Sequence, residues 1–131
     1  MARDYVAGTW EANRSFSPAV ITTGGRIAWL AGVGAWKDDQ GNVLRGDFAA
    51  QVNQTFKEIG ETLARFGGSL SDITTMTVWI LDVRYGNEFT ELRKQWFPDG
   101  NYPASALIAA AGFAQPDMML EIQAVAVLGD G

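Results

Sequence analysis

The chain has 131 residues, of which 47% are hydrophobic and 19% charged, as expected for one ordinary globular domain spanning residues 1–131. Its net charge of −5 disfavours nonspecific binding to nucleic acid. It contains no cysteine and no histidine, which excludes disulfides, Cys/His zinc sites and Ser-His-Asp chemistry, so acid–base work falls to Asp, Glu, Tyr, Lys or water. No segment has the length of a signal-peptide core or a membrane span, so we expect a cytoplasmic protein with no membrane contact.

The N-terminal third predicts short strands. Residues 1–17 are mixed and give at most one edge strand. Two apolar runs, 19–23 and 26–31, flank Gly24-Gly25, and this pattern is typical of a β-hairpin. The glycines that follow, in Gly32-Val33-Gly34, either form a plain bulge or let a ligand approach the backbone closely.

The middle of the chain predicts an amphipathic helix over about 47–66. Apolar residues recur there at spacings of three and four, with Asp47 as the cap and Gly67-Gly68 as the end. The residues on this predicted face are Phe48, Val52, Phe56, Ile59, Leu63 and Phe66.

The C-terminal half predicts three strands and a second helix. Residues 73–81 are rich in β-branched side chains and indicate a buried strand. A helix follows from about Asn87, its expected cap, to Pro98. Two strands, 104–110 and 119–128, close the chain. The second helix should place Phe89, Leu92, Arg93 and Trp96 on one face.

The last strand alternates, which predicts a sheet covered on one side. Its wholly apolar face, which should lie under the helices, consists of Leu120, Ile122, Ala124, Ala126 and Leu128. The fold class is therefore α+β, a single mixed sheet with two helices on one face. The opposite face, with Val125, Val127 and the Leu107 side of the neighbouring strand, is too apolar to face water, so we expect oligomerisation through the sheet.

Six motifs occur in order along the chain: FSPAV (16–20), LAGVG (30–34), TTMTVWILDV (74–83), FxxLRKQWF (89–97), PASA (103–106) and LEIQAVAV (120–127). From about residue 16 to 128 they resemble the Rid (reactive intermediate deaminase, YjgF-like) family. The resemblance implies a homotrimeric, chorismate mutase-like barrel with a pocket between neighbouring subunits. It also implies hydrolysis of enamines or imines, such as 2-aminoacrylate, to keto acids and ammonium, with no metal or organic cofactor.

The chain departs from the deaminating branch of that family at Ser105, where the branch has an arginine that grips the substrate carboxylate. A serine hydroxyl offers one neutral hydrogen bond, whereas bonds to a charged group are worth about 1.5–3 kcal/mol each. Leu107 makes the pocket more apolar. Arg14 and Arg93 either replace the missing arginine or are plain surface charges. We therefore expect a larger, less anionic substrate than 2-aminoacrylate.

Glu121 matches the family glutamate that orients or activates water, and it is the candidate catalytic residue. The alternative is an ion pair or hydrogen bond across the subunit interface.

Other positions match the lining of the family pocket. Gly32 and Val33 would present backbone amides, Phe16 and Ser17 would lie over the pocket, and Thr90 would face it from the helix. Phe16 could equally belong to the core, and Thr90 could simply be solvated. Trp36 could wall an aromatic-sized pocket.

The sequence thus predicts a cofactor-free hydrolase or deaminase that acts on an enamine, imine or related C=N metabolite. An alternative is a non-catalytic protein that binds a metabolite or a partner. A third function to weigh is ribonuclease action, against which the acidic charge and the lack of histidine argue.

Overall fold

The structure is a computed structural model that describes residues 1–129. Its elements in chain order are β1 (Ala2–Tyr5), α1 (Thr9–Asn13), β2 (Val20–Thr23), β3 (Arg26–Trp29), α2 (Phe48–Ala64), η1 (Leu70–Asp72), β4 (Ile73–Ile80), η2 (Val83–Tyr85), α3 (Gly86–Trp96), β5 (Ala104–Ala109) and β6 (Leu120–Leu128).

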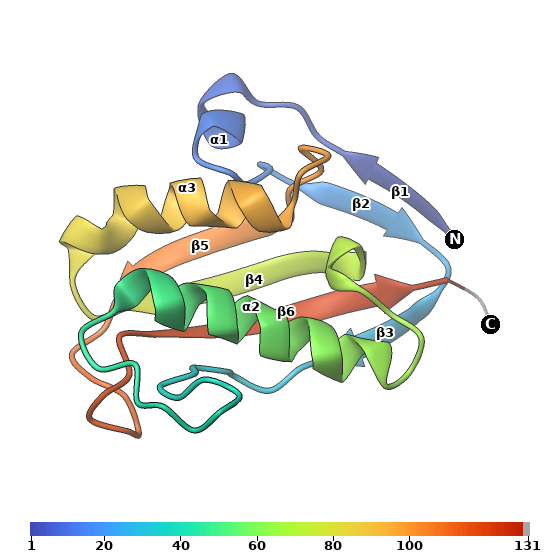
Figure 1. Cartoon of the computed structure of the whole chain (residues 1–131). Coiled ribbons are helices and arrows are strands. Elements are labelled where there is room, and N and C mark those ends of the chain that lie inside the picture. The colour runs from blue at the N-terminus through green and yellow to red at the C-terminus, as the bar shows by residue number, and fades with distance from the viewer. Residues whose placement is uncertain (130–131) are drawn as a thin grey trace.

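Four strands form the main sheet in the order β3-β6-β4-β5. The β4 and β5 strands are parallel, while β6 runs antiparallel to both β4 and β3, so the sheet is mixed. Helices α2 and α3 lie side by side across one face of this sheet (Figure 1). The predicted α+β class, with a mixed sheet and two helices on one face, is confirmed.

Helix α2 buries the predicted apolar face against the sheet. Its cap is Asp47, whose side chain accepts a hydrogen bond from the Ala50 N–H at 3.1 Å. Five of the six predicted residues are buried in the core, but Phe66 is 38% exposed. The helix ends at Ala64, two residues before Phe66, because the chain turns away there and Gly67 adopts a left-handed conformation with φ of 85°.

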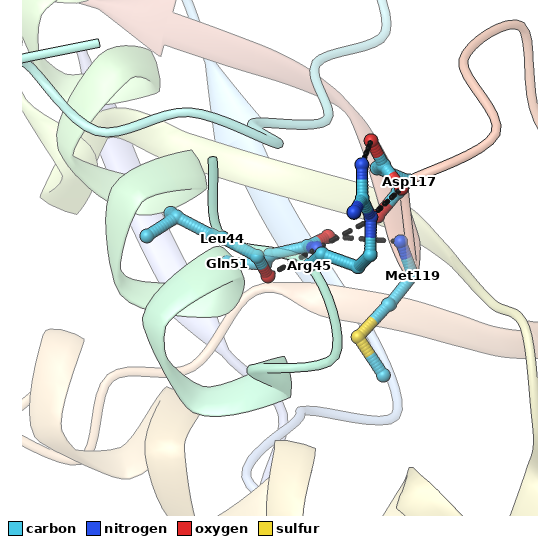
Figure 2. Close-up of polar contacts among 5 residues, drawn as sticks. All are labelled: Leu44, Arg45, Gln51, Asp117 and Met119. Carbon is cyan, nitrogen blue, oxygen red and sulfur yellow. Dashed lines mark hydrogen bonds and ion pairs between the residues drawn. The ribbon is translucent and has the colours of Figure 1, made fainter. Parts of the chain in front are cut away.

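The Gln51 side chain forms hydrogen bonds from α2 to one segment that precedes the helix and to another that follows it in the chain (Figure 2). The side chain is completely buried. Its amide nitrogen donates to the carbonyls of Leu44 and Asp117 at 3.0 and 2.8 Å, and its oxygen accepts from the Met119 N–H at 2.9 Å. An apolar side chain at this place would leave the Asp117 carbonyl and the Met119 N–H unpaired, whereas the Leu44 carbonyl would keep its hydrogen bond from the Asp47 N–H.

The β6 strand confirms the predicted alternation, with its apolar face buried under the helices. The prediction that Leu107 lies on the bare face, the side of the main sheet opposite α2 and α3, was wrong. Leu107 on β5 is in register with Val78 and Ile122, both fully buried, and it packs against the core on the helix-covered face. The bare face carries instead Trp79, Glu121 and Ile108, which share the next register row.

The predicted hairpin around Gly24-Gly25 was also wrong. The β2 strand pairs with β1 in a separate two-stranded sheet, whereas β3 pairs with β6. Both glycines have positive φ, 74° and 83°, so the chain does turn here, but it passes from one sheet to the other. The expected single sheet is therefore accompanied by this small one.

The second helix differs slightly from its prediction. It begins at Gly86 rather than after a cap at Asn87, whose side chain instead accepts a hydrogen bond from Arg14 at 2.7 Å. The helix ends at Trp96, before Pro98, as expected.

Candidate functional site

A pocket of about 390 Å³ lies where α1, α3 and the beginning of β5 meet. Its lining residues are Trp10, Arg14, Phe16, Thr90, Arg93, Ser105 and Leu107. Six of these were proposed from the sequence, and they come from three separate stretches of the chain.

Arg93 lies on the inner face of α3 and is only 2% exposed. Its guanidinium donates three hydrogen bonds: Nε to Ser15 Oγ at 3.0 Å, Nη1 to Ser105 Oγ at 2.8 Å and Nη2 to the Arg14 carbonyl at 3.1 Å. The guanidinium also lies 5.0 Å from the centre of the Phe89 ring. Arg93 is therefore no surface charge, which removes one of the two interpretations left open by the sequence.

All three acceptors of Arg93 are neutral. Within residues 1–129, no carboxylate forms an ion pair with it. Burial, followed by the positive charge of Arg14, lowers the pKa of Arg93 to about 9, and Tyr102 opposes this shift. The group remains a cation at neutral pH.

Ser15 accepts a hydrogen bond from the Arg93 guanidinium, a contact that the sequence did not predict. It is fully buried and is the one non-glycine residue among those described that has a positive φ, 62°. Its hydroxyl donates to the Arg14 carbonyl at 2.7 Å while it accepts from Arg93. Such a conformation costs free energy for a serine and often accompanies a functional site.

The remaining walls of the pocket are largely apolar. The Trp10 and Phe16 rings meet edge to face with centroids 5.7 Å apart, and Trp10 is 65% exposed. Phe16 thus lines the pocket and does not belong to the core. Thr90 is buried, and its hydroxyl donates to the Gly86 carbonyl of its own helix at 3.0 Å.

Glu121 does not line this pocket. It lies half-buried on β6, on the bare face of the sheet, while Ser105 is in register with Met76 on the helix-covered face. The β4 strand separates β5 from β6, which places their axes about 10 Å apart. The carboxylate packs against Gly32, where an added Cβ would stand 2.8 Å from Oε2.

Two further predicted residues also lie outside the pocket. The Val33 N–H donates to the Ile122 carbonyl at 2.8 Å, so it is already occupied by backbone pairing. Ser17 lines a neighbouring cavity of about 510 Å³, and its hydroxyl donates to the Tyr102 carbonyl at 2.6 Å. Trp36, suggested as an aromatic wall, is not among the residues that line the pocket around Arg93.

Sequence reasoning missed Trp10 and Ser15. Trp10 carries no periodic signal in its five-residue helix, and the left-handed backbone of Ser15 has no sequence signature. Within the described chain, no three potential metal-ligating side chains cluster. None of the helices in residues 1–129 is both long and apolar enough to cross a membrane.

The sequence profile of the endoribonuclease L-PSP family matches residues 8–128. A curated human protein, 2-iminobutanoate/2-iminopropanoate deaminase, is 29% identical over 114 residues, covering 87% of this chain and 80% of the human one.

Solved structures show the same fold. YyfB of Yersinia pestis, of the conserved Rid protein family, aligns with a TM-score of 0.86 at 21% identity, covering 98% of this chain and all of that one. Rv2704 of Mycobacterium tuberculosis, of the YjgF/YER057c/UK114 family, aligns with a TM-score of 0.66 at 24% identity, covering 97% and 100%. The chain therefore belongs to the endoribonuclease L-PSP family, that of the Rid and YjgF proteins, as its sequence motifs predict.

Proposed function

We propose that this protein hydrolyses imines or enamines without a cofactor, in a pocket that is completed by a second copy of the chain. The observation that carries the proposal is the division of the candidate site between the two faces of one sheet. No carboxylate from the described residues lines the pocket around Arg93 and Ser105, and Glu121 lies on the bare face beside Gly32. The human relative, named as an imine deaminase, supports the same class of reaction.

The bare face supports association of copies. Ile27, Trp29 and Ile108 lie on it and are 56%, 77% and 44% exposed. Large apolar side chains gathered on one face of a sheet favour burial against another chain. In the homotrimer that we propose, Glu121 of one copy closes the pocket of its neighbour.

Hydrolysis of a C=N group needs a base, an acid and a way to hold the oxygen. Glu121 takes a proton from the attacking water as the water oxygen bonds to the imine carbon and the π electrons of the C=N bond move to the nitrogen, and Glu121 then gives the proton to that nitrogen. Glu121 next carries the hydroxyl proton of the carbinolamine to the amine nitrogen, the C–N bond breaks with its electrons leaving on ammonia, and the oxygen forms the C=O group. The Gly32 N–H, which has no hydrogen-bond partner in residues 1–129, is the group to which we assign the binding of an oxygen of the reacting molecule.

The replacement of the β5 arginine by Ser105 leads us to propose substrates other than 2-aminoacrylate. This is tested by measuring ammonia release from freshly generated 2-iminopropanoate and from imines with larger side chains. Turnover of 2-iminopropanoate as fast as by the human relative would refute the altered preference.

The catalytic role is tested with Glu121→Gln, for which we expect at least about a hundredfold loss of turnover because the general base is removed. Glu88→Gln, on the exposed side of α3, is the matched control and should keep full activity. If the wild-type protein consumes no C=N compound yet binds keto acids, the alternative of a non-catalytic metabolite-binding protein is supported instead.

A further inference from the structure

Among residues 1–129, no counter-charge accompanies the buried guanidinium of Arg93. Its three hydrogen bonds use three of its five N–H groups, and all three acceptors are uncharged oxygens. A charged group is costly to bury unless it is paired, so a cation held in this way by neutral groups indicates an absent anionic partner.

A second cation points to the same place. Arg14 follows α1 directly and lines the pocket together with Arg93, and its positive charge acts on Arg93. Its Nη1 is fixed by the side chain of Asn87, again a neutral acceptor. Two guanidinium groups that meet in one pocket repel each other unless an anion lies between them.

Ser105 has a role in this arrangement that the sequence did not suggest. Its hydroxyl accepts a hydrogen bond from Nη1 of Arg93 and donates onward to the Ala106 carbonyl at 3.4 Å, so it holds the guanidinium at the pocket wall. Ser105, which stands where the deaminating branch of the family has its arginine, thus contacts an arginine from α3.

We propose that Arg93 and Arg14 bind the carboxylate of the substrate, and that Ser105 and Ser15 position Arg93 for this purpose. The inference rests on the proposed function for the location of the site and specifies its substrate class. The substrate is then an anionic imine or enamine, and the expectation of a less anionic substrate is replaced. The apolar side chains of Trp10, Phe16 and Leu107 also line the 390 Å³ pocket. We therefore expect the substrate to carry an apolar or aromatic group besides its carboxylate.

Binding of two stable probes tests the anion site without any reaction. The probes are 3-phenylpropanoate and its neutral amide, titrated by calorimetry and by tryptophan fluorescence into the Glu121→Gln protein. We expect the acid to bind at least about tenfold more tightly than the amide, because only the acid can pair with a guanidinium. Equal affinity for acid and amide in this protein would overturn the proposal.

Variants then assign the preference to residues. Arg93→Met and Arg14→Met should each lower affinity for the acid about tenfold and leave the amide within about twofold. The matched control is Arg65→Met, which removes an exposed charge at the end of α2 and should change neither. Arg14 is only partly buried, so the Arg14→Met variant should still fold and remain informative if Arg93→Met does not fold. Acid preference retained in folded Arg14→Met would contradict the proposal.

The positioning role of Ser105 has a separate readout. Ser105→Ala should reduce the ratio of acid to amide affinity although both arginines remain, and Ser105→Thr should restore it because the hydroxyl returns. An unchanged ratio in Ser105→Ala would remove Ser105 from the site.

The anion site and the proposed function can fail independently. If the protein prefers the acid but hydrolyses no C=N compound, the anion site stands and the proposed function fails. If it hydrolyses C=N compounds but binds acid and amide equally, the proposed function stands and the anion site is refuted.

Discussion

The Glu121 carboxylate packs against Gly32, a position that carries no side chain. A Cβ built on Gly32 would lie 2.8 Å from Oε2 and 3.0 Å from Cδ of Glu121. The contact joins β6 to the segment that follows β3 and fixes where the carboxylate can lie.

Gly32→Ala should therefore displace Glu121 without unfolding the protein. The Gly32 backbone is not in the left-handed region, so alanine fits its conformation, and the atom that must move is at the end of a flexible side chain. We expect turnover to fall about tenfold or more, because small misplacements of a catalytic group are costly. Gly112→Ala, where an added Cβ meets nothing within 4 Å, is the control. Full activity in Gly32→Ala would contradict the proposed role of Glu121.

Gln51→Met should destabilise the protein by about 3 kcal/mol, since it leaves the Asp117 carbonyl and the Met119 N–H unpaired in the interior and removes one of the two hydrogen bonds to the Leu44 carbonyl. Urea denaturation followed by circular dichroism measures the change. Gln95→Met, on the exposed side of α3, should stay within about 0.5 kcal/mol of the wild type. A loss below about 1 kcal/mol for Gln51→Met would show that water replaces the amide.

Trp29→Asp should convert the proposed trimer to monomers, because it places a charge at the centre of an apolar contact between sheets. The oligomeric state is measured by light scattering after gel filtration at micromolar concentration. The matched control is Val83→Asp, which should leave the oligomeric state unchanged. Val83 is 74% exposed on η2, compared with 77% for Trp29 on the bare face. Association that survives Trp29→Asp and Ile27→Asp would rule out the bare face as the interface.

The affinity for 3-phenylpropanoate should depend on pH through Arg93. Only the protonated guanidinium binds the anion, and burial has lowered its pKa to about 9, with Arg14 and Tyr102 as the other titratable groups acting on it. Affinity should stay constant from about pH 6 to 8 and decline above about pH 9 toward a level about tenfold lower, the same loss that is expected for Arg93→Met. The affinity for the amide serves as the control and should stay level. Unchanged affinity for the acid through about pH 10.5 would place the charge elsewhere.

The sequence predicted those parts of the fold that depend on local periodicity. The apolar face of α2 and the alternation of β6 are properties of single segments, and both are confirmed. The pairing of β2 and β3 was predicted wrongly, because two strands joined by a turn form a hairpin only when neither has a better partner. Here β6 takes β3, and β1 takes β2.

The pocket was predictable in its residues but less so in its chemistry. Arg93 shares a helix face with Phe89, as predicted, but the sequence left open whether Arg93 replaces the missing arginine or is a plain surface charge. Its contacts with Ser15 and Ser105 join residues 78 and 12 positions apart, and the sequence gives no measure of such distances. The orientation of Leu107 also could not be read, because moving a strand by one residue exchanges its faces.

Because Arg93 and Glu121 lie on opposite faces of the sheet, two different variants should be able to complement each other. Chains that carry Arg93→Met and chains that carry Glu121→Gln are each impaired in a different half of the proposed site, so at low substrate concentration their defects are complementary. When they are mixed and reassembled at equal ratio in a closed ring, about a quarter of the junctions should combine an intact half from each parent. The mixture of the two variants would then regain about that fraction of wild-type turnover. No such gain is possible if both halves of every site come from the same polypeptide.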